Sequence, residues 1–254
     1  MKERSAIEAG EIEFFAPYYE GQAYNTTGWR LRLQRELHSL LRVAGRPLKR
    51  VLSLGCGDGQ FELMLAAHAE HVTGLDISPE AIALAKRMAE QQGVTNAEFL
   101  CQPLADLSWN DKYDCIVCLG FLHHVPETEL PNLLRQAHEH LLEGGLFYAE
   151  DPNKHGILRL LGRIVLGKKY DRYHTPDERE LDPAEIRESL ELAGFVSAKT
   201  GYIDLTLIPA LFVLAKGPAW PKAQQAGSKA GAVQTEALQQ VLTDSRQPLV
   251  HLTH

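Results

Sequence analysis

The chain has 254 residues, 44% of them hydrophobic and 23% charged, which suits one sizeable domain with additions. Its net charge of −7 provides no overall positive field, which argues against nucleic acid as the main partner. The charged start, MKERSAIEAGEIEFF, lacks the apolar segment of a secretory signal, and no run reaches the roughly 18 apolar residues that cross a bilayer. We therefore expect a cytoplasmic protein.

Residues 1–47 precede the regular pattern of the chain and are expected to form a helical cap. Aromatic residues, among them Tyr18, Tyr19, Tyr24 and Trp29, come before an arginine-rich amphipathic segment. Ligands of open α/β sheets bind at the carboxyl ends of the strands, and we expect the cap to cover that edge. The aromatic side chains then form either the core of the cap or a wall around a ligand.

The centre of the chain alternates short apolar runs with segments of helical spacing. The apolar runs lie at 50–55, 71–78, 97–102, 113–120 and 144–152, and the helical segments at 59–70, 78–93, 127–145 and 182–195. Strands separated by helices and glycine turns indicate βαβ units, and therefore a parallel α/β sheet covered on both faces. Further strands are expected around 195–203 and 210–216.

Capping residues mark the ends of the predicted helices. Ser78 and Asp182 are expected N-caps, and a proline follows each of them in the first turn. Glycines are expected at the C-terminal ends, namely Gly93, Gly194 and the pair Gly144 and Gly145.

Two segments depart from the alternation. Residues 153–182 are predicted to form a lid insertion within a domain that covers 48–217. Its stretch GILRLLGRIVLG has apolar residues at helical spacing and two arginines, Arg159 and Arg163. Three interpretations stay open for it: a lid over an apolar substrate, a basic helix on a membrane surface, or a homodimer contact. Residues 218–254, rich in Ala, Gln, Gly and Ser, are expected to form a loosely ordered tail.

Cys115 and Cys118 form a C-x-x-C pair, which suggests either a redox pair or half a zinc site. The surrounding YDCIVCLG is typical of a strand, and residues three apart on a strand point to opposite faces. We therefore expect buried structural thiols.

The stretch VLSLGCGDGQF places a glycine-rich loop between a strand and a helix. A dinucleotide fingerprint would need glycine at position 60, where this chain has Gln60. The third glycine is Gly59, and it is expected to widen the bare surface of the turn. Asp76, at the end of the next strand, is suited to accept hydrogen bonds from the two hydroxyls of a ribose.

Four stretches, VLSLGCGDGQF, VTGLDIS, YDCIVCLGFLHHVPE and LLEGGLFYAEDPN, occur in this order along the chain. Together they resemble the class I S-adenosylmethionine-dependent methyltransferases over roughly residues 48–217. The resemblance implies a doubly wound, Rossmann-like sheet of seven mostly parallel strands with an antiparallel last strand. It also implies S-adenosyl-L-methionine as the cofactor.

The resemblance assigns cofactor-binding roles to residues of this chain. The backbone at Gly55, Cys56 and Gly57 would lie beside the methionine part of the cofactor, where a side chain would collide. Asp76 would hold the ribose hydroxyls, and Ile77 would pack on the adenine ring.

Two leucines extend this implied site. Leu119 would line the methionine end through its backbone, and Leu104 would offer its backbone N–H to the adenine. The family often has an aspartate where this chain has Pro103. The adenine amine would then need another partner, either Gln102 or Asp106.

Methyl transfer from a sulfonium requires a proton acceptor only when the methylated group must lose a proton. His123 and His124, in GFLHHVPE after the fourth strand, are the catalytic candidates, because imidazole titrates near neutral pH. Alternatively, one histidine caps the sheet or the next helix and the other is exposed. His155 and His174 in the insertion are further candidates for substrate contact.

We expect a metal-independent methyltransferase that acts on oxygen, nitrogen or carbon of a small, apolar or aromatic metabolite. No metal is expected, because Asp151 and Asn153 have no matching third ligand in the sequence. An RNA or protein methyltransferase is one alternative and would need a basic surface patch. A cofactor-binding but non-catalytic partner subunit is another.

Overall fold

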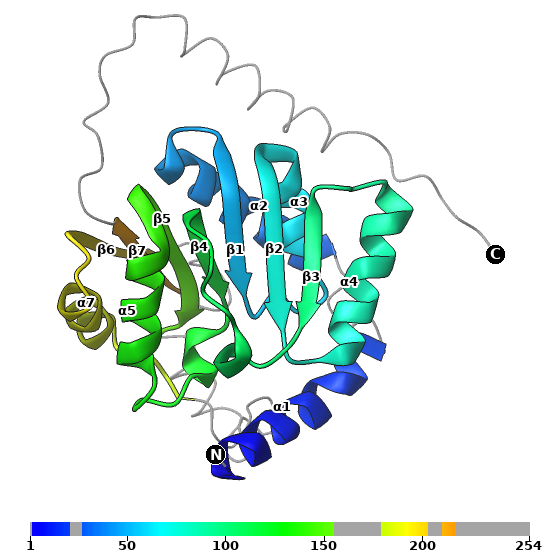
Figure 1. Ribbon diagram of the computed structural model, residues 1–254, viewed down its shortest axis with the longest axis horizontal. Helices are drawn as coiled ribbons and strands as arrows, with labels where there is room; N and C mark the ends of the chain where they lie inside the picture. Colours follow the sequence, from blue (N-terminus) through cyan, green and yellow to red (C-terminus); the bar gives the residue numbers. More distant parts are fainter. Residues whose placement is uncertain (1, 21–26, 155–178, 203–209, 217–254) are drawn as a thin grey trace, which may run out of the picture. The chain divides into compact units, whose positions relative to one another are not determined.

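The computed structural model describes residues 2–20, 27–154, 179–202 and 210–216 (Figure 1). All of them belong to one compact unit, Met1–Trp220. Tyr24, His155, His174, most of the predicted lid and the predicted tail lie outside the described residues. Within the described ranges, no helix has both the length and the apolar character to span a membrane.

The described strands form one seven-stranded sheet in the order β3-β2-β1-β4-β5-β7-β6. Neighbours among the first five strands pair in parallel, whereas β7 pairs antiparallel with both β5 and β6. The predicted α/β class with a mostly parallel sheet is confirmed. The strands are β1 (Leu48–Leu54), β2 (Ala69–Asp76), β3 (Ala97–Cys101), β4 (Tyr113–Leu119), β5 (Leu141–Pro152), β6 (Ser197–Tyr202) and β7 (Ala210–Lys216).

Helices cover both faces of this sheet (Figure 1). One face carries α2 (Thr27–Ala44), α3 (Gln60–Leu65) and α4 (Pro79–Gln92), and the other carries α5 (Leu130–His140) and α7 (Pro183–Leu192). Val51 and Val117 join the first core, and Ile116 and Phe147 join the second. Both cores arise because successive strand residues point to opposite faces.

The predicted caps at Ser78, Gly93 and Asp182 are present. The Ser78 hydroxyl accepts a hydrogen bond from the Ala81 N–H at 3.2 Å, and Gly93 ends α4 with φ of +67°. The Asp182 carboxylate accepts one from the Ala184 N–H at 2.9 Å at the start of α7. Local side-chain chemistry therefore determines where these helices begin.

The helix predicted at 127–145 is shorter than expected. α5 ends at His140, and β5 begins at the buried Leu141. The expected capping glycines lie inside β5, where the pairing with β4 shifts register and Gly144 has φ of +73°. They form a bulge instead of a helix cap, because burial of Leu141 draws the chain into the sheet.

The two cysteines of the C-x-x-C pair point to opposite faces, as predicted. Cys115 packs in the core under α2 and α3, and Cys118 packs in the core under α5 and α7. Both are free thiols, and burial raises the pKa of each well above its ordinary value. They are structural residues.

The N-terminal segment contains two helices where the sequence indicated one. α1 (Lys2–Glu20) precedes α2 and continues through Pro17. The carboxyl ends of β1 to β4 point toward α1 (Figure 1). Three short 3₁₀ turns, η1 (Ala66–His68), η2 (Leu104–Asp106) and η3 (Leu122–His124), complete the described elements.

Candidate active site

A pocket of about 270 Å³ lies at the carboxyl ends of β1, β2 and β4. Its wall contains the glycine loop that follows β1, the end of β2, the turn after β3 and the loop after β4. α1 contributes several side chains to the same wall, among them Glu11, Phe15 and Tyr19. The N-terminal helices and the loops of residues 55–129 thus meet at the sheet edge where α/β proteins bind ligands.

The glycine loop presents bare backbone to this pocket. Gly55 and Gly57 have φ of +71° and +53°, which side chains rarely allow. A Cβ on Gly55 would lie 2.4 Å from Cδ2 of Phe121, and one on Gly57 would lie 3.1 Å from the Tyr19 hydroxyl. Any side chain at Gly55 would therefore collide with the Phe121 ring, which also lines the pocket.

Gly59 does not widen the bare surface, as the sequence suggested it would. It is buried, and a Cβ there would lie 2.6 Å from the Phe99 ring and 2.8 Å from Ala85. The glycine lets α4 and β3 pack tightly against the loop. The expectation was wrong because strand β3 lies under the loop at this point.

Asp76 is held at the pocket wall by backbone groups. Its Oδ2 accepts a hydrogen bond from Gly57 N–H at 2.8 Å, and its Oδ1 accepts one from Ser78 N–H at 2.9 Å. Burial raises the pKa of this carboxyl, and the two backbone hydrogen bonds oppose the rise. Each carboxylate oxygen has a further lone pair with which it can accept a ligand hydroxyl.

The structure brings all the predicted cofactor residues into one wall. The lining includes Gly55, Cys56, Gly57, Asp76, Ile77, Leu104 and Leu119. Of the two predicted partners for an adenine amine, Gln102 lines the pocket, whereas Asp106 is exposed and lies outside the lining.

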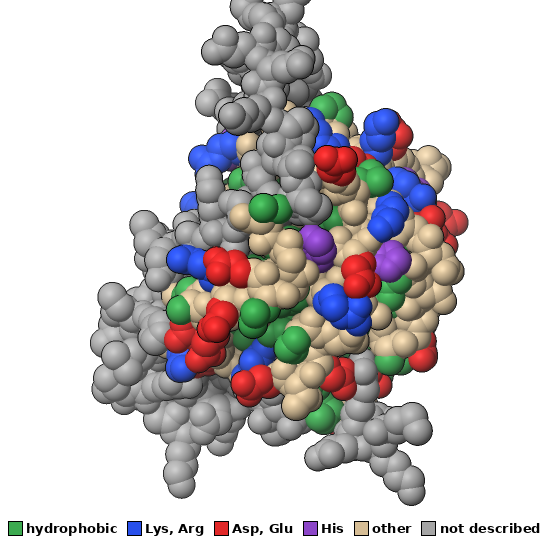
Figure 2. All heavy atoms as spheres, turned by 60° about the vertical axis from the view of Figure 1, so that its left-hand side comes forward, with side chains coloured by type: hydrophobic (Ala, Val, Ile, Leu, Met, Phe, Trp, Pro, Cys, Tyr) green, Lys and Arg blue, Asp and Glu red, His purple; other side chains and the backbone are tan. Residues whose placement is uncertain are grey.

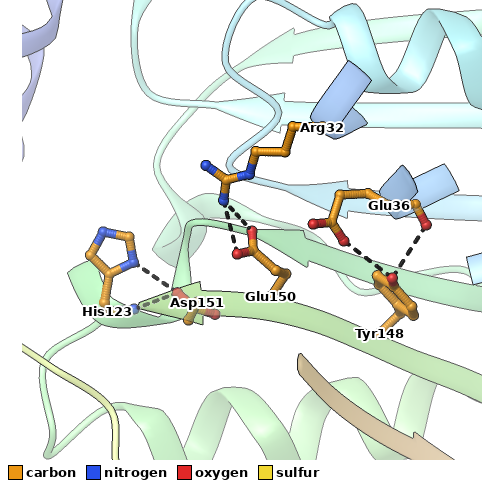
Figure 3. Close-up of polar contacts among 6 residues, drawn as sticks. All are labelled: Arg32, Glu36, His123, Tyr148, Glu150 and Asp151. Carbon is orange, nitrogen blue, oxygen red and sulfur yellow. Dashed lines mark hydrogen bonds and ion pairs between the residues drawn. The ribbon is translucent and has the colours of Figure 1, made fainter. Parts of the chain in front are cut away.

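The two predicted catalytic histidines lie in different environments. His124 lines the pocket, but His123 is only 7% exposed and is absent from the lining. The backbone N–H and ring Nδ1 of His123 both contact Oδ1 of Asp151, at 3.1 and 2.8 Å (Figure 3). Burial raises the pKa of Asp151 to about 8, and the hydrogen bond from His123 N–H opposes this rise. His123 therefore fixes the turn η3 to β5, which matches the alternative of a capping histidine.

His124 faces α1 across the pocket wall. Its Nδ1 lies 3.0 Å from Oε1 of Glu11. The Phe15 ring meets the imidazole edge to face at 5.7 Å between centroids, and the His123 ring lies 3.9 Å away. Sequence patterns did not indicate Glu11 or Phe15, because these contacts exist only once α1 has docked.

The pocket wall is rich in carboxyl groups. Those in the lining are Glu8, Glu11, Asp58, Glu62, Asp76 and Glu129. Among the described lining residues there is no lysine or arginine. Glu62 is the most enclosed of them, since its Oε1 accepts a hydrogen bond from the Ser53 hydroxyl at 2.6 Å and burial raises its pKa to about 7.

On the opposite side of the sheet from Asp151, Glu150 anchors α2. The Nη2 atom of Arg32 donates to both carboxylate oxygens of Glu150, each at 2.8 Å (Figure 3). The same guanidinium lies 5.0 Å from the centroid of Trp29, which lines the pocket. The ion pair thereby holds an aromatic side chain in the wall.

No cluster of three or more histidine, cysteine, aspartate or glutamate side chains suited to a metal ion occurs within the described ranges. Asp151 and Asn153 are both buried, and Asp151 is bonded to His123.

Comparison with known proteins supports one family. Residues 51–145 match the family described as "Methyltransferase domain". The chain is 28% identical over 153 residues to a ubiquinone biosynthesis O-methyltransferase of Aeromonas salmonicida, covering 58% of this chain and 63% of the relative. It is 40% identical over 82 residues to one of Coxiella burnetii, covering 32% and 35%. The chain thus spans less than two thirds of the length of these relatives.

Solved structures share the fold. The magnesium protoporphyrin IX methyltransferase ChlM of Synechocystis, with bound SAH, has a TM-score of 0.64 at 24% identity, over 83% of this chain and 99% of its own. The DhpI–SAH complex has a TM-score of 0.63 at 22% identity, over 84% and 98%. The matched segment contains the glycine loop, Asp76 and both histidines, so residues 51–145 are similar to a methyltransferase domain, and the chain shares the fold of these SAH-bound structures.

Proposed function

We propose that this chain transfers a methyl group from S-adenosyl-L-methionine to a small, apolar or aromatic acceptor. The observation that carries the proposal is the convergence of the bare glycine loop, Asp76 and Ile77 in one pocket at the carboxyl edge of a methyltransferase fold. Structures of this fold with SAH bound support the same cofactor here.

The pocket residues fit this cofactor. The backbone at Gly55, Cys56 and Gly57 would lie beside the methionine part, where a Cβ on Gly55 would obstruct the space. Asp76 would accept hydrogen bonds from the ribose hydroxyls, and Ile77 would pack on the adenine. Leu119 would line the methionine end through its backbone, and Leu104 would offer its backbone N–H to the adenine. Gln102 would take the adenine amine that the family's usual aspartate would otherwise bind.

S-adenosylmethionine, when bound, supplies a methyl group on a sulfonium, which is transferred by direct displacement. The protein's contribution is then to align the acceptor and exclude water. Apolar side chains suited to this task, including Ile12, Phe15, Trp29, Leu33 and Phe121, line the pocket. They favour an apolar or aromatic acceptor.

His124 is the proposed proton acceptor for a substrate that must lose a proton on methylation. It lies in the pocket wall, whereas His123 is bonded to Asp151 in the core. The second histidine of the sequence motif therefore has the proposed catalytic role, and the first holds it in place.

Charge favours a small molecule over nucleic acid as the acceptor. The lining carries six carboxyl side chains, which would repel a polyanion. Figure 2 shows acidic and basic side chains interspersed on the face that carries α5 and α7 in Figure 1, without one dominant basic patch among the coloured residues. The names of the relatives point the same way, to ubiquinone biosynthesis and to magnesium protoporphyrin IX.

Calorimetry with S-adenosylmethionine and S-adenosylhomocysteine tests the cofactor site. Asp76→Ala is expected to weaken binding by about 10-fold or more, because hydrogen bonds to a charged group contribute roughly 1.5–3 kcal/mol. Asp106→Ala removes an exposed carboxylate outside the pocket and serves as the matched control. Unchanged affinity in Asp76→Ala, or no binding by the wild type, contradicts the site.

A labelled methyl donor and a cell extract test the reaction. Label is expected in the low-molecular-mass fraction, together with release of S-adenosylhomocysteine. Label in RNA or in protein would support the macromolecular alternative. Cofactor binding without release of product in any fraction would support a non-catalytic subunit.

A further inference from the structure

His124 meets a carboxylate that comes from a distant part of the chain. Its Nδ1 and Oε1 of Glu11 are 3.0 Å apart, and the two side chains are only 13% and 15% exposed. The Phe15 ring, one helical turn from Glu11 on α1, packs against the same imidazole. The docked α1 therefore shields this contact from solvent at the pocket wall.

The charges around the pocket favour the protonated form of His124. Within the described lining, His124 is the only side chain able to become a cation, and the other titratable groups there are six carboxyls, the Tyr19 phenol and the Cys56 thiol. A carboxylate 3.0 Å from an imidazole stabilises its protonated form, and shielding from water strengthens the effect. Further titratable or charged groups around His124 and Glu11 are Glu8 of α1, Asp76 of β2, His123 of η3, Glu129 before α5, Asp151 of β5 and Arg179, which interacts with Asp151.

We infer that Glu11 is a positioning residue that orients His124 and stabilises its protonated ring, so that the base is complete only when α1 covers the pocket. The inference rests on the proposed function. Because Nδ1 lies 3.0 Å from the Glu11 carboxylate, exchange of a proton with the acceptor falls to Nε2.

The proposed step balances as follows. The proton of the acceptor O–H or N–H moves to Nε2 of His124. The electron pair that it leaves forms the bond to the transferred methyl carbon, and the pair of the broken carbon–sulfur bond stays on sulfur. The imidazolium that results faces the Glu11 carboxylate, which stabilises it until the proton passes to water.

Glu11→Gln tests the inference, with Glu13→Gln as its control. Both variants remove one carboxylate from α1, but Glu13 is exposed and lies outside the pocket lining. Glu11→Gln is expected to lower kcat by about 10-fold or more, since a positioned base contributes about 10² to 10⁴. It is also expected to move the acidic limb of the pH–rate profile about one unit lower, while Glu13→Gln retains the wild-type profile. Glu11→Asp is expected to recover part of the rate.

A second measurement needs no acceptor. An NMR titration of the His124 ring is expected to show a lower midpoint in Glu11→Gln than in the wild type or Glu13→Gln, and thermal unfolding checks that each variant is folded. Equal midpoints and equal pH–rate profiles in Glu11→Gln and Glu13→Gln would overturn the inference while wild-type turnover upholds the proposed function. A wild type that binds no S-adenosylmethionine would refute both.

Discussion

Glu62 is a buried carboxyl group whose ionisation should be measurable in the stability of the protein. It is 2% exposed on α3, and its Oε1 accepts the Ser53 hydroxyl. Its Oε2 is buried and receives no hydrogen bond. Burial is the main reason that its pKa rises from 4.5 to about 7, and the Ser53 hydrogen bond opposes the rise. Glu62→Gln keeps the size of the side chain and removes the titration.

The sign and size of the effect follow from linkage between protonation and folding. Between about pH 4.5 and pH 7 the folded protein retains a proton that the unfolded chain has released. The stabilisation from this group is thus fully present below pH 4.5 and is lost as the pH rises through 7. A rise of about 2.5 units at about 1.4 kcal/mol per unit corresponds to about 3 kcal/mol in the free energy of unfolding.

Urea unfolding followed by circular dichroism across this pH window measures the effect. We compare the free energy of unfolding of Glu62→Gln with that of the wild type at each pH. Between acidic and neutral to alkaline pH, this difference is expected to change by about 3 kcal/mol in favour of the variant. Glu70→Gln, which removes an exposed carboxylate, is expected to run parallel to the wild type. If Glu62→Gln also runs parallel, Glu62 is ionised in the folded protein and the argument from burial is refuted.

Three further outcomes follow from local geometry. Gly55→Ala should weaken S-adenosylmethionine binding by about 10-fold or more in calorimetry, because its φ of +71° and its contact with a ring leave no space for a Cβ; wild-type affinity would contradict the role of the bare loop. Ser78→Ala should cost about 1 kcal/mol in urea unfolding through loss of the α4 cap, and a cost near zero would show that the cap is dispensable. A thiol reagent should modify the exposed Cys101 in the native protein and reach the buried Cys115 and Cys118 only after unfolding; early reaction of all three would contradict the packing.

The parts of the fold that could be predicted have local causes. The N-caps Ser78 and Asp182 and the apolar runs act within a few residues, so their patterns are visible in the sequence. α1 has no such pattern, since its apolar side chains are spread around the helix instead of forming one stripe. The bulge at Gly144 escaped prediction because pairing with β4, not the local chain, decides between a helix cap and a strand.

The candidate site divides in the same way. The glycine loop and Asp76 each lie within a short continuous motif, and these motifs predicted that both would lie at one site. The pairing of Glu11 with His124 joins residues that are distant along the chain, and only the docking of α1 brings them into contact. The role of Gly59 was mistaken because it depends on Phe99, a neighbour in space that the motif does not contain.

The end of β5 explains how one strand supports both walls of the pocket. Glu150 and Asp151 are adjacent, so their side chains point to opposite faces of the sheet (Figure 3). Through Arg32, Glu150 holds α2 and the Trp29 ring at the pocket. Through His123, Asp151 holds the turn that carries the proposed base. The Glu150 and Asp151 side chains are both nearly inaccessible to water, so either carboxyl group would be costly to bury without its partner. This cost keeps α2 and the turn η3, and with them both walls of the pocket, fixed to the sheet.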